Sequence, residues 1–269
     1  MAARAAYIAG FSSTSNLEAG RRHGVPTGGT AAHAFTLLHE SEREAFEAQV
    51  ASLGVGTTLL VDTYDVNEGV KTAVEVAGTS LGGVRLDSGD LVVQASEVRE
   101  QLDALGATET KIVVTSDLDE YAIAALAAAP VDTYGVGTRV VTGSGHPTAS
   151  MVYKLVARED DEGRMIGVAK KSKDKQSVGG RKYALRRRNP LGVAEAEVLG
   201  IGEQPVGDGD DRDLLVRLVE GGEVVGREHA SLEGARARHE ASVAELPRSA
   251  HQLSQGQPAV ETVFLTETP

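Results

Sequence analysis

The 269-residue chain has no cysteine and no tryptophan, and only 4% of its residues are aromatic. The lack of cysteine excludes disulfides, thiolate metal sites and a cysteine nucleophile, and it fits a cytoplasmic location. The scarcity of aromatic residues argues against a platform on which nucleic-acid bases stack. No segment approaches the roughly 20 apolar residues of a membrane span, and the first residues lack the apolar core of a secretory signal. We therefore expect neither nucleic acid nor a membrane as a partner.

The net charge of the chain is −12, and 41% of its residues are hydrophobic. This acidic balance argues against broad, non-specific binding of nucleic acid. The charge is distributed unevenly, because residues 151–190 hold 12 Lys and Arg against 5 Asp and Glu. This basic stretch could face the phosphate groups of a small ligand.

A short apolar run that ends in a small, polar or acidic cluster occurs five times. The five are GGTAAH (28–33), TLLVDTYD (58–65), GVRLDSGDL (83–91), KIVVTSDL (111–118) and DTYGVGT (132–138). Apolar runs without polar alternation are typical of strands buried on both faces, as in a parallel sheet covered by helices. In such sheets ligands bind at the carboxyl ends of the strands, where these polar clusters fall.

The element pattern predicts an α/β fold in the first part of the chain and mostly β structure after it. We expect strands over 26–31, 57–61, 83–86, 111–115 and 132–135, and helices over 33–53, 66–78, 91–105 and 118–128. This spacing is typical of a β/α barrel or a doubly wound sheet, although a closed barrel needs about eight strands. Short strand-like runs and a helix near 231–245 follow, so we place a domain boundary near residue 150, between 1–150 and 151–269.

The GVRLDSGDL motif places Arg85 and Asp87 on the same side of a strand, because side chains alternate along it. An arginine suits a carboxylate or phosphate, and an aspartate suits sugar hydroxyls or Mg²⁺. The alternative is a structural Arg85–Asp87 salt bridge, with Asp90 as the N-cap of the following helix. In LLVDTYD, Asp62 is the better candidate for the site, whereas Asp65 is better explained as an N-cap.

Two further motifs suggest phosphate chemistry. IVVTSDL and YGVGT follow neighbouring strands, and together they could form a phosphate cradle from backbone N–H groups, although Gly-Val-Gly is more often only a tight turn. His33 stands where a strand meets a helix. It could be a general base, a phosphoryl acceptor or only a packing residue. His39 lies six residues further on, which is not the spacing of a helical metal pair.

Taken in order, these motifs resemble the nicotinate phosphoribosyltransferase family and, more broadly, the type II phosphoribosyltransferases. The matching pieces are STSN (13–16), AGRRHGVPTGGTAAHAF (19–35), LLVDTYD, VRLDSGDL, IVVTSDL and YGVGT, with a weaker basic match over 170–186. The resemblance implies transfer of phosphoribosyl from phosphoribosyl pyrophosphate to nicotinate in NAD salvage, assisted by Mg²⁺ and coupled to ATP hydrolysis. It also implies a homodimer.

The resemblance assigns roles to individual residues. His33 corresponds to the histidine that ATP phosphorylates, Arg85 and Asp87 contact the substrates, and Asp62 lies near the ribose. Asp62 and Asp87 are also the candidate Mg²⁺ ligands. The remaining residues that it implies for substrate or phosphate binding are Ser15, Thr30, Ser116, Asp117, Gly135, Gly137 and Thr138.

The family has a further N-terminal portion that supplies the first barrel strands, and no counterpart precedes Met1 in this sequence. We therefore expect a partial (β/α) barrel with a C-terminal, mostly β appendage, and weak or no activity of the isolated chain. Two alternatives stay open: a quinolinate phosphoribosyltransferase-like enzyme, and a truncated, non-catalytic homologue that binds phosphoribosyl groups. The His33 motif and VRLDSGDL favour the nicotinate branch over the quinolinate one.

Overall fold

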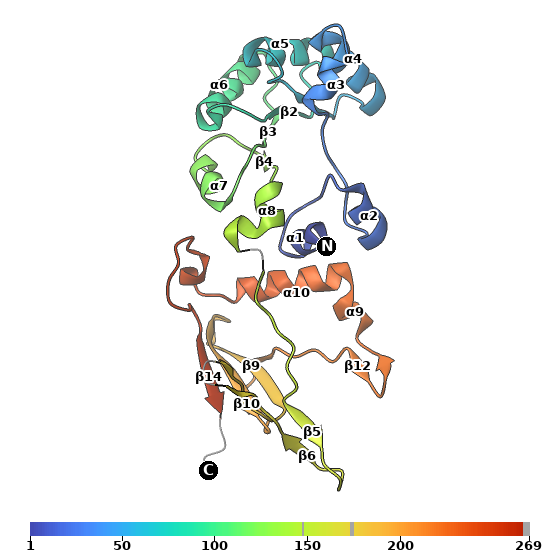
Figure 1. Ribbon diagram of the computed structural model, residues 1–269. Helices are drawn as coiled ribbons and strands as arrows, with labels where there is room; N and C mark the ends of the chain where they lie inside the picture. The colour runs from blue at the N-terminus through green and yellow to red at the C-terminus, as the bar shows by residue number, and fades with distance from the viewer. Residues whose placement is uncertain (147, 173–174, 266–269) are drawn as a thin grey trace.

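The computed structural model describes residues 1–146, 148–172 and 175–265, and its N-terminal part is an α/β unit (Figure 1). Four parallel strands lie side by side in chain order, and helices connect them. The strands are β1 (Thr58–Leu60), β2 (Gly83–Leu86), β3 (Lys111–Val114) and β4 (Thr133–Tyr134). The connecting helices are α5 (Val66–Ala77), α6 (Leu91–Ala104) and α7 (Glu120–Leu126). The predicted α/β class with a parallel sheet is confirmed.

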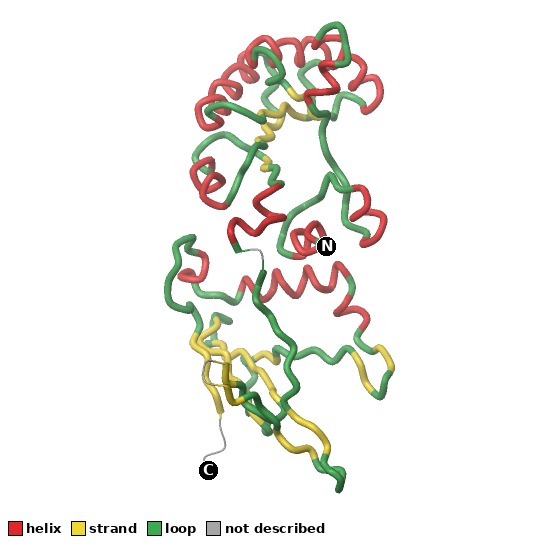
Figure 2. Tube along the Cα trace, in the orientation of Figure 1, coloured by secondary structure: helices red, strands yellow, loops and turns green. Residues whose placement is uncertain are grey.

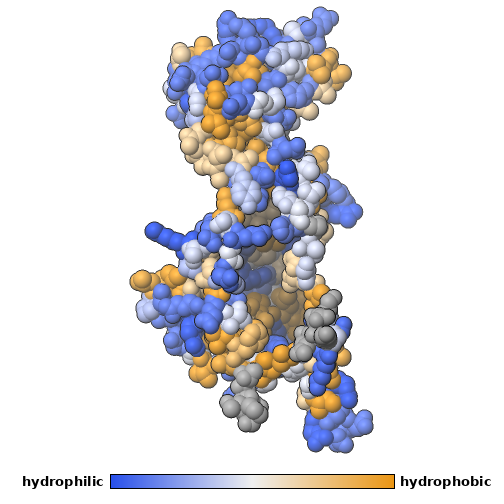
Figure 3. Space-filling model, turned by 60° about the vertical axis from the view of Figure 1, so that its left-hand side comes forward, coloured by the Kyte–Doolittle hydropathy of each residue, from blue (hydrophilic) through white to orange (hydrophobic). Residues whose placement is uncertain are grey.

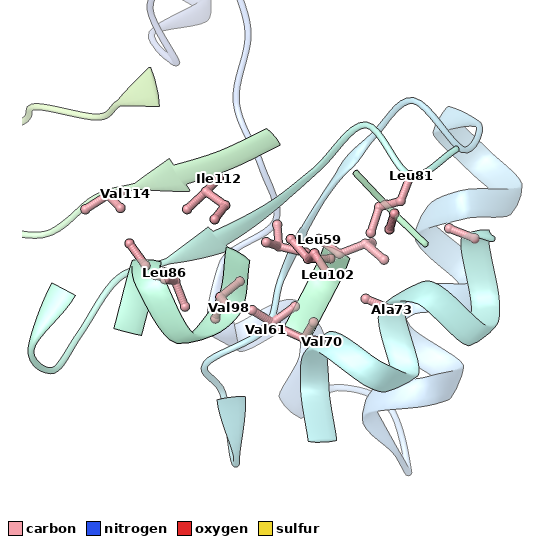
Figure 4. Close-up of a cluster of buried hydrophobic side chains, with 14 of the residues drawn as sticks. Leu59, Val61, Val70, Ala73, Leu81, Leu86, Val98, Leu102, Ile112 and Val114 are labelled. Atoms are coloured by element: carbon pink, nitrogen blue, oxygen red, sulfur yellow. The ribbon is translucent and has the colours of Figure 1, made fainter. Parts of the chain in front are cut away.

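The main hydrophobic core lies between this sheet and the helices that cover it (Figure 4). Leu59, Leu86 and Ile112 come from the strands, and Val70 and Leu102 come from α5 and α6; all five side chains are fully buried. Each such side chain stabilises the fold by roughly 1.5–3 kcal/mol relative to exposure. Helix α5 approaches the sheet closely at a glycine, since a Cβ on Gly69 would lie 2.4 Å from the carbonyl oxygen of Val61.

Aspartate side chains begin the three connecting helices. Asp65 accepts a hydrogen bond from the backbone N–H of Glu68 at 3.0 Å, and Asp90 accepts one from Val93 at 3.2 Å. Both predicted N-caps are therefore confirmed. Asp119 caps α7 through the N–H groups of residues 121 and 122, so Asp117 is not the cap of this helix.

The prediction of a strand over 26–31 was wrong. In this segment only Thr27 pairs, in a single bridge with Thr14, so the sheet contains four of the five expected strands among the described residues. Pro26 has no N–H to donate and the glycines that follow are disfavoured in strands, which explains why the pairing does not extend. The predicted helix over 33–53 is also interrupted. It forms α3 (His33–Leu37) and α4 (Glu42–Leu53), and the Ser41 hydroxyl caps the second helix.

Two further short helices precede α3, and one follows β4. They are α1 (Ala2–Ile8), α2 (Leu17–His23) and α8 (Thr138–Thr142), and a 3₁₀ turn, η1 (Gly143–Gly145), comes after α8. Helix α2 ends at Gly24 in the left-handed conformation, which glycine adopts without a steric penalty. In the described part of the chain, no helix has the length and apolar character that a membrane crossing requires.

The C-terminal part contains most of the short strands, as Figure 2 shows. Its largest sheet has the order β11-β9-β10-β14 and is mixed. The strands are β5 (Ala157–Glu159), β6 (Met165–Gly167), β7 (Lys171–Ser172), β8 (Lys175–Gln176), β9 (Lys182–Arg188), β10 (Ala194–Ile201), β11 (Arg212–Asp213), β12 (Val219–Glu220), β13 (Glu223–Val224) and β14 (Glu261–Leu265). The helical segments are α9 (Arg227–Ala230), α10 (Leu232–Ala244) and a 3₁₀ turn, η2 (Arg248–His251). Lys173 and Asp174 of the basic match lie outside the described residues, and the boundary near residue 150 stays a prediction.

Candidate functional site

The carboxyl ends of the four parallel strands meet at one edge of the sheet. Register places Leu60 of β1, Arg85 of β2 and Val113 of β3 in one row, so the residues that follow each strand are neighbours. A cavity of about 1370 Å³ opens at this edge. Among the predicted residues, its lining includes Ser15, Thr30, Arg85, Asp87, Ser116, Asp117, Gly135 and Gly137. In the space-filling view the molecule narrows below its upper part, and a hollow lies beneath this waist (Figure 3).

Arg85 is the central side chain of this edge and is mostly buried. Its Nε donates to Thr115 Oγ1 at 2.8 Å, and its Nη1 donates to Thr30 Oγ1 at 2.6 Å and to the carbonyl oxygen of Ala31 at 3.1 Å. Its Nη2 lies 2.9 Å from Asp87 Oδ1. The planar guanidinium thus fixes three segments that are far apart in the sequence, because each of its nitrogens has a different partner.

Asp87 is held in its charged form by its neighbours. Burial raises the pKa of this carboxyl, but hydrogen bonds from Thr115 and Arg85, together with the charges of Arg85 and His33, outweigh burial and leave the pKa below its ordinary value. The Thr115 hydroxyl donates directly to Asp87 Oδ1. The site therefore presents a stable carboxylate beside a cation.

His33 and Asp62 form the second half of the site. The Asp62 side chain is only 2% exposed, and its Oδ2 accepts hydrogen bonds from the backbone N–H of Asp87 and from Ser88 Oγ, both at 2.9 Å. His33 Nε2 lies 3.8 Å from Asp62 Oδ1 and 3.6 Å from Asp87 Oδ2, and its Nδ1 lies 3.1 Å from Thr63 Oγ1. One imidazole nitrogen therefore faces two carboxylates. This arrangement is compatible with both a general base and a phosphoryl acceptor.

The loops after β3 and β4 lie beside this cluster. Ser116 has a φ of 142°, an uncommon conformation for a residue with a side chain, and such strain is often found at functional sites. The next loop approaches closely at Gly135, where a Cβ would lie 2.5 Å from Thr115 Cγ2. Asp117 and Gly137 are exposed, and Thr138 is the first residue of α8. Ser116, Asp117, Gly135 and Gly137 line the cavity, whereas Thr138 is not among its lining residues, and the role of these residues as a phosphate site stays a prediction.

The predicted magnesium ligands, Asp62 and Asp87, both belong to this cluster. No group of three or more His, Asp or Glu side chains with the geometry of a metal site occurs among the described residues. Mg²⁺ is, however, often held by one or two carboxylates together with the phosphates of a substrate. Asp62 Oδ1 is buried and has no hydrogen-bond partner in the described part of the chain. The Asp62 and Asp87 pair therefore fits a cation that a phosphorylated substrate helps to bind.

Sequence reasoning missed several residues of the site. Thr115 is the first polar residue after the apolar run of β3, which is the same signal that identified Asp62 after β1. Glu42, the first residue of α4, gave no such signal, because no local pattern links it to Asp62. Burial raises its pKa to about 7, and the charges of Asp65 and Asp62 add to this effect. One of its carboxylate oxygens is buried without a hydrogen-bond partner among the described residues.

Comparison with known proteins gives several similar sequences, while no protein-family model matches the chain. Nicotinate phosphoribosyltransferase pncB1 of Mycobacterium tuberculosis is 53% identical over 270 residues, which cover 97% of this chain and 59% of the relative. The nicotinate phosphoribosyltransferase of Bacillus subtilis is 40% identical over 77% of this chain and 44% of its own length. The chain thus spans about half to three fifths of the length of these relatives.

Two solved structures resemble the whole chain. Human nicotinic acid phosphoribosyltransferase matches 98% of this chain and 64% of its own with a TM-score of 0.72 and 24% identity, which indicates a shared fold. A nicotinate-nucleotide pyrophosphorylase from Pyrococcus furiosus matches 90% of this chain and 61% of its own, with a TM-score of 0.69 and 25% identity. The strand-end cluster therefore lies in a chain whose sequence and fold both have known counterparts.

Proposed function

Because this chain belongs to the nicotinate phosphoribosyltransferase family, we propose that it acts in the transfer of phosphoribosyl from phosphoribosyl pyrophosphate to nicotinate. The products are nicotinate mononucleotide and pyrophosphate, and the reaction belongs to NAD salvage. The observation that carries the proposal is the convergence of His33, Asp62, Arg85 and Asp87 into one cluster, of which Arg85 and Asp87 line the cavity. These four residues belong to three of the motifs on which the sequence resemblance rests.

The chemistry of the transfer suits these side chains. Loss of pyrophosphate from the ribose carbon develops positive charge on the sugar, and carboxylates close to that carbon stabilise it. Asp62 and Asp87 supply two carboxylates, and the low pKa of Asp87 keeps one of them ionised. Arg85 holds Asp87 in place and links it to the segment that carries His33. In this proposal the loops after β3 and β4 hold the 5′-phosphate.

Mg²⁺ and ATP complete the proposed reaction. When bound, Mg²⁺ would neutralise the negative charge of the leaving pyrophosphate, and Asp62 and Asp87 are the residues that would hold it. ATP is the proposed donor of a phosphoryl group to His33. Since His33 Nε2 faces two carboxylates, a phosphoryl group on that nitrogen would meet strong like-charge repulsion without a cation. The phosphohistidine and the magnesium site are therefore proposed together.

The finer fold belongs to the same proposal. We propose that β1 to β4 form part of a (β/α) barrel of the type II phosphoribosyltransferase kind, and that residues 151–269 form a mostly β appendage. The parallel order and the short connecting helices support a barrel segment. A homodimer and a cytoplasmic location are proposed as well, on the family resemblance and on the absence of cysteine, respectively.

The decisive experiment is turnover of the full chain with nicotinate, phosphoribosyl pyrophosphate and Mg²⁺, with and without ATP, measured as nicotinate mononucleotide by chromatography. His33→Ala should abolish the ATP-stimulated product. His39→Ala is the matched control, because His39 contacts Phe35 and none of the site residues named above. Release of CO₂ from quinolinate would favour the quinolinate reaction. Binding of phosphoribosyl pyrophosphate without turnover would favour the non-catalytic homologue, and neither binding nor turnover would overturn the proposal.

A further inference from the structure

Arg236 of α10 joins the C-terminal part of the chain to the first helix. Its Nη1 donates hydrogen bonds to the carbonyl oxygens of Tyr7 and Phe11, the latter at 2.6 Å, and its Nη2 donates to that of Gly10 at 3.1 Å. The guanidinium also lies 4.4 Å from the centre of the Tyr7 ring. Figure 1 shows α10 next to α1, with the C-terminal sheet on its other side. One side chain therefore binds three backbone carbonyl groups within residues 7–11, about 225 residues away in sequence.

The physical basis of this contact is the end of α1. The last carbonyl groups of a helix have no partner within it, and a cation near that end is favoured by the helix dipole. Helix α1 ends at Ile8, so the carbonyls that Arg236 binds belong to its last turn and to the residues that leave it. The five N–H groups of an arginine can bind several carbonyls at once, which a lysine cannot do with the same geometry.

The segment that leaves α1 forms a wall of the cavity. Residues 11–16 all line it. Thr14 connects this wall to residues 26–28. Its N–H donates to the carbonyl oxygen of Pro26 at 3.0 Å, and its own carbonyl accepts from the N–H of Gly28 at 3.1 Å. Residues 28–30 also line the cavity, and Thr30 Oγ1 accepts a hydrogen bond from Arg85. A continuous series of contacts thus leads from α10 to Arg85.

We propose that Arg236 is a positioning residue. It holds residues 11–16 in place and, through them, residues 28–30, which line the cavity and contact Arg85. Arg236 itself does not line the cavity, so it acts through the backbone that it holds. Ordering this wall before a ligand arrives lowers the entropy that binding must otherwise remove. The effect of losing Arg236 therefore falls on substrate binding more than on the chemical step. The identity of the substrate, phosphoribosyl pyrophosphate, rests on the function proposed above.

The test compares Arg236→Ala and Arg236→Lys with Arg238→Ala. Arg238 is the matched control, because it is exposed on the same helix and donates to the carbonyl oxygen of His229 in α9 instead of to α1. The first readout is amide hydrogen exchange in the full chain without ligand. We expect exchange at Thr14 and Gly28 to accelerate about tenfold or more in Arg236→Ala, less in Arg236→Lys and not at all in Arg238→Ala. Exchange in β1 to β3 should stay at the wild-type rate.

The second readout is kinetic. In Arg236→Ala we expect KM for phosphoribosyl pyrophosphate to rise about tenfold, while kcat changes by less than about twofold. Unchanged exchange at Thr14 and Gly28, or faster exchange throughout β1 to β3, would overturn the positioning role, as would a fall in kcat at constant KM. If the wild-type chain shows neither turnover nor binding of phosphoribosyl pyrophosphate, the proposed function fails by itself. The exchange rates then still decide the role of Arg236.

Discussion

Arg85 Nη2 lies 2.9 Å from Asp87 Oδ1, and the two residues are separated by a single position at the end of β2. Side chains two residues apart point to the same side of a strand, so this pairing follows from the backbone itself. Thr115 contacts both partners, accepting from Arg85 and donating to Asp87. The pair is therefore fixed from two strands, and its charge and orientation are set before any substrate binds.

Replacing Arg85 tests whether this geometry is needed for function. Arg85→Lys keeps the positive charge but cannot bind Thr30, Thr115 and Asp87 together. Hydrogen bonds to charged groups contribute about 1.5–3 kcal/mol, so kcat/KM for nicotinate mononucleotide formation should fall by roughly 10- to 100-fold. Steady-state kinetics measure this loss.

A matched variant separates catalysis from stability in that experiment. Arg99 of α6 also donates to backbone carbonyls, those of Thr110 at 2.8 Å and Ala107 at 3.0 Å, but it lies outside the cavity lining. Arg99→Lys should lower the melting temperature and leave kcat/KM near the wild-type value. Equal losses of kcat/KM in both variants would argue against a specific role for Arg85.

The parts of the molecule that depend on local pattern were predictable from the sequence. The apolar runs of β1, β2 and β3 identified buried parallel strands, and the aspartates at 65 and 90 identified helix starts. Alternation along β2 placed Arg85 and Asp87 together. In each case the determining interaction spans only a few residues, so the sequence contains it directly.

The parts that depend on distant contacts were not predictable. The segment 26–31 has the composition of a strand end, yet its pairing stops at Thr27 because proline and glycine flank it. Thr30 and Arg85 are 55 positions apart, and no local pattern indicates that one binds the other. The contact of Arg236 with the end of α1 spans the chain, and it appears only when α10 is packed against α1.

Thr115 should control the protonation of Asp87. Burial raises the pKa of Asp87 and the Thr115 hydroxyl lowers it, so Thr115→Val removes a lowering interaction while keeping the methyl group that packs against Gly135. The pKa of Asp87 should therefore rise, and the acid limb of the kcat/KM profile should move to higher pH. Thr115→Ser retains the hydroxyl and should keep the wild-type limb. Carboxyl NMR titration of Asp87 provides a readout that does not depend on activity, and an unchanged pKa would contradict the prediction.

Glu42 should make the fold less stable as pH rises. Its pKa is about 7 in the folded chain against 4.5 as its ordinary value, so the folded state binds more protons than the unfolded state between these pH values. The free energy of unfolding should therefore decrease from about pH 4.5 to pH 7 through this group. Because the side chain is partly exposed, solvent screening reduces the effect to the order of 1 kcal/mol.

The Glu42 effect can be isolated by comparing two variants across pH in urea denaturation. Glu42→Gln should be more stable than wild type at pH 8 and similar to it at pH 4.5. Glu47 is exposed on the same helix, so Glu47→Gln should follow the wild-type pH dependence. A stability difference for Glu42→Gln that is the same at both pH values would show that ionisation of Glu42 is not its cause.

Glu245 should be required for the C-terminal sheet to hold α10. Its side chain is buried and accepts hydrogen bonds from Arg186 at 3.1 Å, Arg188 at 3.0 Å and Arg212 at 2.6 Å. Burial raises the pKa of Glu245, but the arginines outweigh burial and leave it below its ordinary value of 4.5. Glu245→Gln removes the negative charge that pairs with three buried or partly buried arginines. Loss of one partner of a buried ion pair typically costs about 3–5 kcal/mol of stability.

The pH dependence distinguishes this charge effect from a packing defect. Because the folded pKa of Glu245 is lowered, its stabilisation is fully present above about pH 4.5 and is lost as pH falls through the folded pKa. The free-energy difference between wild type and Glu245→Gln should therefore be largest near pH 7 and shrink in acid. Glu240→Gln, at an exposed position of α10, should change stability by less than about 0.5 kcal/mol. If the Glu245→Gln difference stayed constant down to pH 3, side-chain shape would be the cause. Arg236 lies on α10, the helix that Glu245 directly follows. If Glu245→Gln loosens α10 from the C-terminal sheet, amide exchange at Thr14 should therefore accelerate as well.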